Sequence, residues 1–152
     1  MATIDIQSVS QAPCPSSREL VRWAEAALEG KDAELSLRLV DEAEMAKLNL
    51  RYRQRSGPTN VLSFPFDAPA EVVPGFLGDV VICAPVVARE AKAQGKAESA
   101  HWAHMVVHGI LHLRGYDHLT LEEAEEMEIK ERQILSSLGY QDPYLIEEII
   151  QS

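Results

Sequence analysis

Three histidines lie within eleven residues of this 152-residue chain, at a spacing that suits a metal ion. His108 and His112 are four residues apart, so one face of a helix presents both rings to the same ion. His118 lies too far along for a continuous helix, but Gly115 tolerates the left-handed conformation that ends a helix and lets the chain turn back. We therefore predict one zinc ion held by His108, His112 and His118, although imidazole ligands also suit nickel, copper and iron.

A site of three imidazoles leaves the ion its full charge and at least one open position, which is typical of catalytic rather than structural zinc. The spacing equals that of the metzincin proteases, H-E-x-x-H-x-x-G-x-x-H, but Gly109 stands where those enzymes have their catalytic glutamate. Glycine inside a helix costs about 1 kcal/mol relative to alanine. Gly109 therefore indicates either space above the metal for a bulky tetrahedral group or close packing of another backbone against the helix.

His101 and His104 precede the three expected ligands and fall on the same helical stripe as His108. The stripe is too long for one ion to reach every ring, so we interpret both side chains as supporting the ligands, facing substrate or merely solvated. Asp117, beside the third ligand, either orients an imidazole or starts the next turn. The sequence leaves these alternatives open.

Three arginines alternate in Arg51-Tyr-Arg53-Gln-Arg55, at the end of an expected helix and the start of a loop. Cations are ordinary at a helix C-terminus, where the helix dipole favours them. Guanidinium groups also make two-point contacts with phosphate oxygens and stabilise charge that develops during phosphoryl transfer. The cluster indicates either helix-end electrostatics or phosphate recognition.

Length and composition predict one globular domain over residues 1–152. No segment has the pattern of a signal peptide or of a membrane span, so we expect a cytoplasmic protein. The net charge of -10 argues against a nucleic-acid partner, but residues 117–152 alone hold ten acidic and two basic side chains. Most of these acids are expected on the solvated face of one helix: Glu122, Glu123, Glu125, Glu126, Glu128 and Glu131.

Hydrophobic periodicity predicts an α+β fold, with a small mixed four-stranded sheet covered by helices and the zinc site on a helix and its following turn. The expected strands cover residues 3–9, 35–40, 60–64 and 76–83. The expected helices cover residues 17–29, 41 to about 50, 85–94, the histidine stretch, 120–139 and 144–150. Asp41 with Glu44 and Thr120 with Glu123 predict helix caps. Residues 67–75 are expected to form a surface loop.

The segment from His108 to His118 resembles the signature of the YbeY family of bacterial endoribonucleases and ribosomal RNA maturation factors. Tyr52-Arg53 with Pro58-Thr-Asn-Val-Leu-Ser-Phe64 is similar to a second motif of that family, and the resemblance extends from about residue 35 to about residue 144. The sequence departs from the family pattern at Asn60, where the family often has aspartate, and at residues 54–56. Neither departure touches an expected metal ligand.

The resemblance implies zinc ligands at His108, His112 and His118 and an arginine implicated in activity at Arg53. It implies a single-strand-specific endoribonuclease that acts in 3′-end maturation of 16S ribosomal RNA and in ribosome quality control. The implied partners are ribosomal RNA, the small ribosomal subunit and ribosomal or assembly-factor proteins, with no DNA and no membrane.

We assign catalytic roles to Arg53, which would neutralise the phosphate, and to His108, as a ligand of the zinc that would activate water or polarise a phosphodiester oxygen. The alternatives are a metzincin-like metalloprotease and a non-catalytic ribosome assembly factor with a structural zinc.

Overall fold

The computed structural model describes residues 2–66 and 75–144. The described strands are β1 (Thr3–Ser8), β2 (Glu34–Val40), β3 (Val61–Pro65) and β4 (Phe76–Cys83). The described helices are α1 (Ser17–Leu28), α2 (Glu42–Arg53), α3 (Ala84–Gln94), α4 (Glu98–Leu113) and α5 (Leu121–Ser137). The predicted elements are confirmed, except that α2 continues past its expected end. Apart from Tyr144 and Gly75, the expected helix over residues 144–150 and the loop over residues 67–75 lie outside the described residues.

The four strands form one mixed sheet in the order β1-β2-β4-β3. β1 pairs with β2 and β2 with β4 in parallel, whereas β3 runs antiparallel to β4. The predicted α+β class and the small mixed sheet are therefore confirmed. Since β3 has β4 on one side only, it forms an edge of the sheet within the described residues.

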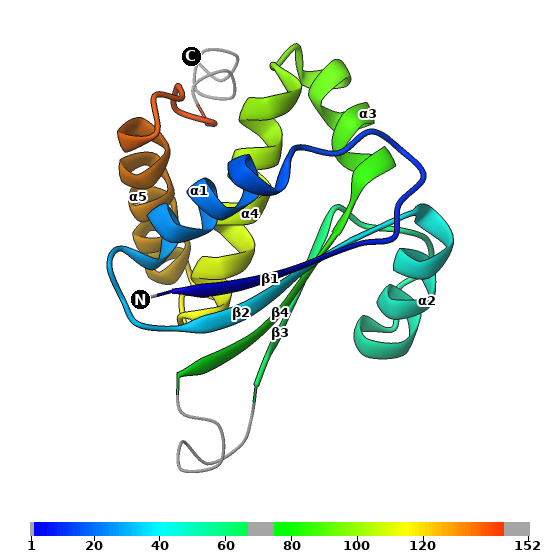
Figure 1. Cartoon of the computed structure of the whole chain (residues 1–152), viewed down its shortest axis with the longest axis horizontal. Coiled ribbons are helices and arrows are strands. Elements are labelled where there is room, and N and C mark those ends of the chain that lie inside the picture. The colour runs from blue at the N-terminus through cyan, green and yellow to red at the C-terminus, as the bar shows by residue number, and fades with distance from the viewer. Residues whose placement is uncertain (1, 67–74, 145–152) are drawn as a thin grey trace.

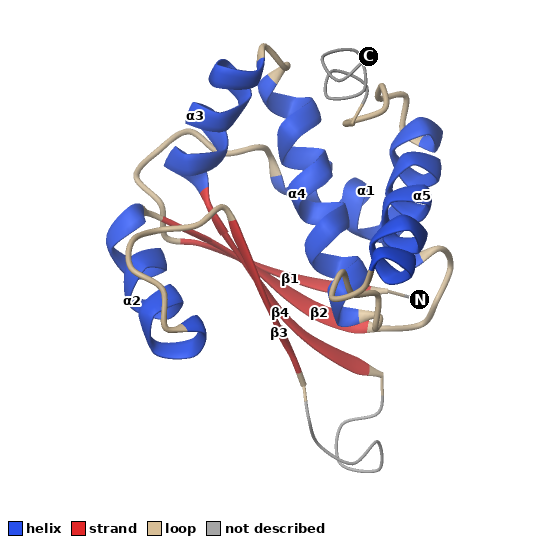
Figure 2. Cartoon of the chain, turned by 180° about the vertical axis from the view of Figure 1, so that it is seen from behind, coloured by secondary structure: helices blue, strands red, loops and turns tan. Residues whose placement is uncertain are grey.

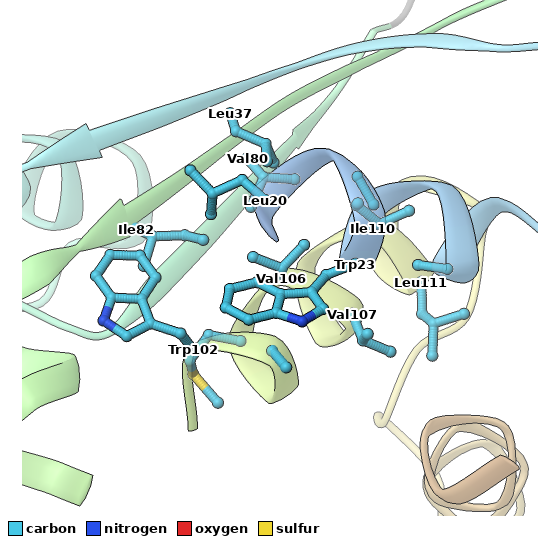
Figure 3. Close-up of a cluster of buried hydrophobic side chains, with 14 of the residues drawn as sticks. Leu20, Trp23, Leu37, Val80, Ile82, Trp102, Val106, Val107, Ile110 and Leu111 are labelled. Carbon is cyan, nitrogen blue, oxygen red and sulfur yellow. The ribbon is translucent and has the colours of Figure 1, made fainter. Parts of the chain in front are cut away.

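The helices cover the two faces of the sheet unequally (Figures 1 and 2). Helices α1, α4 and α5 lie on one face, and α2 lies on the other. The main core fills the first of these layers, where Trp23 of α1 and Trp102 of α4 are almost fully buried among aliphatic side chains such as Val80 and Ile82 (Figure 3). Buried aromatic rings contribute much of the energy of a core because each covers a large apolar area.

A smaller apolar cluster, which includes Met45, Leu62 and Val81, lies on the α2 side of the sheet. None of the described helices combines the length and the apolar character that crossing a membrane requires.

One predicted helix cap is confirmed and the other is wrong. The Thr120 hydroxyl accepts the Glu123 N–H of α5 at 3.1 Å, as predicted. Asp41 precedes α2, but its carboxylate makes no capping bond and instead accepts hydrogen bonds from the Ser10 hydroxyl and the Gln11 N–H. Glu44, the other half of the predicted capping box, pairs with an arginine of β2. Asp41 and Glu44 thus make hydrogen bonds with residues outside α2 rather than with each other's backbone.

Candidate metal centre

Helix α4 and the turn after it bring the three predicted ligands together. His108, His112 and His118 each offer a ligand atom, and these atoms all lie within 4.8 Å of one another. The ring centroids of His108 and His112 are 4.8 Å apart, and those of His112 and His118 are 5.0 Å apart. Three imidazoles at this spacing suit a single divalent ion.

The turn that reverses the chain depends on Gly115, whose φ is +99°. Its N–H donates to the carbonyl of His112, and the Tyr116 N–H donates to the carbonyl of Leu111, both at 3.0 Å. This pair of bonds is the Schellman motif, in which a residue with positive φ closes the last helical turn. The predicted role of Gly115 is confirmed, and the turn directs the chain toward His118.

Two neighbours of the turn hold it in place. Arg114 donates from Nη1 to the carbonyl of Ala27 at 2.7 Å and pairs with Glu29, which ties the turn to the end of α1. The Asp117 carboxylate accepts the backbone N–H of His118 at 2.7 Å. Of the two alternatives for Asp117, its place in the turn is therefore the one that its hydrogen bond supports.

The environment of His112 favours the neutral form of its imidazole, which is the form that binds metal. His112 is half-buried, and burial together with the neighbouring rings of His108 and His118 lowers the pKa of its imidazole below the usual range. A neutral imidazole has a lone pair available for a metal, whereas a protonated one does not. The donor set and its environment thus fit zinc.

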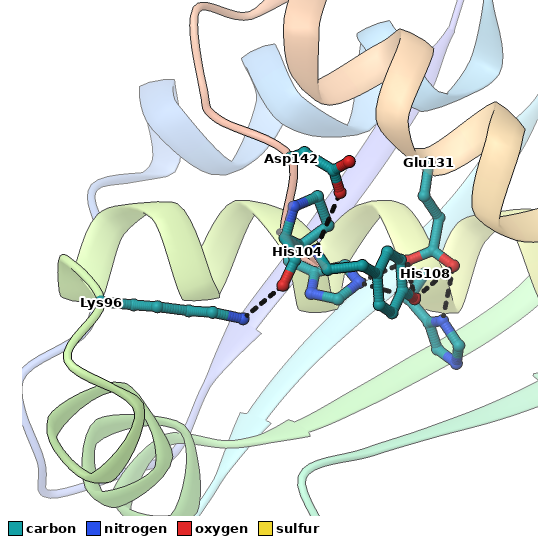
Figure 4. A network of polar contacts seen from close by, with 7 residues as sticks. Lys96, His104, His108, Glu131 and Asp142 are labelled. Atoms are coloured by element: carbon teal, nitrogen blue, oxygen red, sulfur yellow. Dashed lines mark hydrogen bonds and ion pairs between the residues drawn. The ribbon is translucent and has the colours of Figure 1, made fainter. Parts of the chain in front are cut away.

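A buried carboxylate lies directly behind the ligands. Glu131 of α5 is 1% exposed, and its carboxylate contacts the Nε2 atom of His104, the Nδ1 atom of His108 at 3.4 Å and the hydroxyl of Tyr144 at 3.0 Å (Figure 4). Burial raises the pKa of Glu131, but the hydrogen bonds from His104 and His108 outweigh burial and lower the pKa to about 2. The side chain is thus an ionised carboxylate that the surrounding donors satisfy.

The prediction that Glu131 belongs to a solvated acidic face is wrong, whereas the other five acids of that set are exposed or half-buried. The sequence holds a signal for this. Met127, Ile134 and Leu135 are buried, and position 131 falls on the same stripe of α5 at helical spacing. An acid on an apolar stripe indicates a buried carboxylate with partners.

His101 and His104 are 3% and 7% exposed, so the interpretation of these rings as solvated is wrong. The Nε2 atom of His101 lies 2.9 Å from Glu90, and Asn60 donates to the same carboxylate at 3.0 Å. Neither histidine lines the cleft described below. The supporting role fits His104, whose Nε2 atom contacts the same Glu131 carboxylate as His108, whereas His101 has its contact with Glu90.

The three expected ligands open onto a cleft of about 480 Å³ at the β3 edge of the sheet. Arg53, the last residue of α2, lines the same cleft although it is 55 positions before His108 in the sequence. The remaining walls come from β3 and its approach and from the turn after α4: Thr59, Asn60, Val61, Leu62, Ser63, Pro65, Gly115, Tyr116, Asp117 and Leu119.

The structure separates the three clustered arginines. Arg51 and Arg55 are exposed and do not line the cleft, and the guanidinium of Arg51 lies 5.3 Å from the centre of the Tyr52 ring. The loop after Arg53 is held by Asn49, a buried side chain that sequence reasoning missed and that donates to the carbonyl of Gly57 at 2.8 Å. Of the three arginines, only Arg53 lines the cleft.

Gly109 is explained by packing against the sheet. A Cβ atom at this position would lie 2.5 Å from the side chain of Val80 and 3.2 Å from that of Val61. The Gly109 carbonyl also accepts the Ser63 hydroxyl at 2.8 Å, which ties α4 to β3. Close packing is thus the alternative that the contacts support, although side chains rather than a second backbone fill the space.

Comparisons with known proteins agree with this fold and site. A family model described as "Endoribonuclease YbeY" matches residues 6–139. The chain is 56% identical over 144 residues to the "Endoribonuclease YbeY" of Methylococcus capsulatus, with 95% of this chain and 96% of that relative covered. It is 52% identical over 151 residues to a protein of the same description from Pseudomonas entomophila, with 97% and 96% covered.

The solution structure of TM1509 from Thermotoga maritima is similar at a TM-score of 0.58 and 25% identity, over 94% of this chain and 98% of that one. The sequence matches and the fold thus agree over nearly the full length of both partners. The chain belongs to the YbeY endoribonuclease family.

Proposed function

We propose that this protein is a zinc-dependent endoribonuclease that cleaves single-stranded RNA. One zinc ion would be held by His108, His112 and His118. The observation that carries the proposal is that His108, His112, His118 and Arg53 all line one cleft, with the ligand atoms of the three histidines within 4.8 Å of one another. When bound, zinc supplies a Lewis acid that lowers the pKa of water and polarises a phosphate oxygen.

The protein's own residues supply the rest of the chemistry. Arg53 binds the scissile phosphate through its planar fork and offsets the negative charge that grows as the phosphodiester is attacked. His108, His112 and His118 contribute neutral donors, so the site keeps a net positive charge toward the phosphate. The volume of the cleft falls in the range of sites that hold one small ligand, which is enough for one nucleotide of an RNA strand.

We propose further that the substrate is the 3′ end of precursor 16S ribosomal RNA. The enzyme would then act with the small ribosomal subunit and its assembly proteins in the cytoplasm, in maturation and in ribosome quality control. The names of the relatives support RNA cleavage. The ribosomal substrate rests on the resemblance of the two motifs around Arg53 and His108 to the family.

The metalloprotease alternative lacks a general base. Gly109 carries no side chain, and among the described residues that line the cleft Asp117 is the only carboxylate. Asp117 already accepts the backbone N–H of His118. The cleft therefore supports phosphoryl transfer better than peptide hydrolysis.

The decisive experiment combines metal analysis with cleavage of a ribosomal RNA precursor fragment, in wild type and in His112→Ala. We expect His112→Ala to lose zinc and to cleave at least about 100-fold more slowly, the scale of losing a group that stabilises transition-state charge. Its fold should persist, since the buried core clusters contain none of the three ligands. His101→Gln is the matched control, because it changes a histidine of the same helix that does not line the cleft.

Unfolding of His112→Ala would support a structural zinc instead. Unchanged cleavage by metal-free His112→Ala would contradict the proposal. Digestion of an unfolded protein substrate that a chelator abolishes would support the protease alternative.

A further inference from the structure

The described residues hold a second group of ligand-type side chains directly behind the proposed zinc ligands. His104, His108 and Glu131 bring one nitrogen or oxygen atom each within 4.8 Å of the others, and His108 belongs to both groups. Figure 4 shows the Glu131 carboxylate reaching from α5 toward the two imidazoles of α4. If His108 binds the proposed zinc ion, Glu131 is the residue that contacts the other side of this ligand.

The two nitrogens of His108 face different partners. Nδ1 lies 3.4 Å from the Glu131 Oε1 atom, and a carboxylate oxygen accepts a hydrogen bond from a ring nitrogen that carries a proton, so this contact favours the tautomer with the proton on Nδ1. The lone pair of the neutral ring is then on Nε2. We assign this atom to the group with His112 and His118, each of which brings a ligand atom within 4.8 Å of one on His108.

We propose that Glu131 is a positioning residue of the metal centre, which fixes His108 with its proton on Nδ1 and its lone pair on Nε2 toward the ion. The inference rests on the proposed zinc site and deepens it. A carboxylate behind a ligating imidazole orients the ring and makes it a stronger donor. The side chain is a part of the site although it is buried and never touches substrate.

The other partners of Glu131 show that this carboxylate is itself held in place. The Tyr144 hydroxyl lies 3.0 Å and 3.1 Å from the two carboxylate oxygens, and the His104 Nε2 atom contacts one of them. A buried carboxylate is tolerated when donors satisfy it in this way. With Tyr144 and His104 on the carboxylate, Glu131 acts as a hydrogen-bond acceptor for His108 rather than as a ligand of a second ion.

Helix α4 offers a matched pair for comparison. His101 contacts Glu90 at 2.9 Å, so it is also a histidine that faces a carboxylate from a neighbouring helix. His101, however, is not among the three grouped ligands and does not line the cleft. Glu90→Gln therefore removes the same type of contact from the same helix without touching the proposed ligands.

The first test uses the wild-type protein without metal. Nitrogen-15 NMR shifts of the histidine rings, recorded at mildly alkaline pH where an ordinary imidazole is neutral, report which nitrogen carries the proton. We expect the Nδ1-protonated tautomer for His108. The Nε2-protonated tautomer would overturn the proposal, and no variant needs to fold for this result.

The second test compares zinc affinity by competition with a chromophoric chelator. We expect Glu131→Gln to bind zinc about 10- to 100-fold more weakly than wild type, the usual loss for an orienting partner. Glu90→Gln should keep the wild-type affinity. Equal affinities of all three proteins, or equal losses in the two variants, would contradict a specific role for Glu131.

A third variant tests whether a general disturbance of the buried network, rather than loss of the carboxylate, lowers zinc affinity. Tyr144→Phe removes the hydroxyl on Glu131 and keeps the carboxylate beside His108, so His108 should retain the Nδ1-protonated tautomer and most of its zinc affinity. Wild-type protein that binds two zinc ions, with Glu131→Gln losing only the one that contacts His104, would instead show a second metal site and overturn the proposal. These readouts use no RNA, so a failure of the proposed nuclease function would be recognised separately.

Discussion

Arg53 is the one residue of its arginine cluster that the fold directs into the cleft. We expect Arg53→Ala to slow RNA cleavage about 10²- to 10³-fold, because a preorganised group that stabilises transition-state charge is removed. Zinc content should remain that of wild type, since Arg53 is not among the grouped ligands. Cleavage assays measure the rate, and metal analysis measures the zinc content. Arg55→Ala removes the same charge outside the cleft, and a comparable loss in that control would assign the effect to general electrostatics.

Gly109 packs so closely against the sheet that no room remains for a side chain. An added methyl group would lie 2.5 Å from the Val80 side chain, which is completely buried. Overpacking of this kind costs about 1 to 3 kcal/mol, and the gain in helix propensity offsets only about 1 kcal/mol. We expect Gly109→Ala to lower the free energy of unfolding by up to about 2 kcal/mol, as measured by urea denaturation. A variant as stable as wild type would show that α4 can move away from the sheet.

At the scale of elements, the turn after α4 converts a helical pair of ligands into a group of three. The positive φ of Gly115 is unfavourable for any residue with a Cβ atom, at a cost of about 1 kcal/mol for alanine. We expect Gly115→Ala to lose both stability and zinc affinity, because the turn sets the position of His118. Thermal unfolding and chelator competition measure the two effects.

The end of α3 provides the control for this prediction. Gly95 also has a positive φ, +66°, and a Cβ atom there would meet nothing within 4 Å, as at Gly115. Gly95→Ala should lose a similar free energy of unfolding and keep its zinc affinity. A loss of affinity in both variants would mean that global stability, rather than the turn, controls metal binding.

At the scale of the whole molecule, buried titratable groups link stability to pH. The pKa of Glu131 falls from an ordinary 4.5 to about 2 in the folded protein, because hydrogen bonds from His104 and His108 outweigh its burial. The unfolded chain therefore takes up this proton first as the pH falls. Burial also lowers the pKa of the His104 and His112 imidazoles, so protonation of these rings likewise favours the unfolded state.

We expect the metal-free protein to be most stable above about pH 6.5 and to lose stability steadily as the pH falls below that value. Protonation of the histidines lowers the free energy of unfolding first. Protonation of Glu131 then lowers it further, by an amount on the order of 3 kcal/mol between pH 4.5 and about 2. Urea denaturation at a series of pH values measures the slope. Stability that rises on acidification would contradict the assigned directions.

Sequence alone determined the elements and the three expected ligands, because both depend on short-range patterns. His108, His112 and His118 are separated by one helical turn and one glycine-dependent reversal, and local backbone rules suffice to bring them together. The mixed α+β sheet followed from hydrophobic periodicity for the same reason. The family motif indicated Arg53, but no local rule placed this residue in the same cleft as the histidines.

Only the tertiary structure decided which side chains surround these ligands. Glu131 was expected in solvent because its neighbours in the sequence are acidic, but the packing of α5 on α4 buries it against His104 and His108. Asp41 was expected to cap its own helix, but its carboxylate instead accepts a hydrogen bond from the hydroxyl of Ser10, which is distant in the sequence. A polar side chain has many possible hydrogen-bond partners, and they lie far apart in the sequence. Only the folded chain determines which of them are within hydrogen-bond distance.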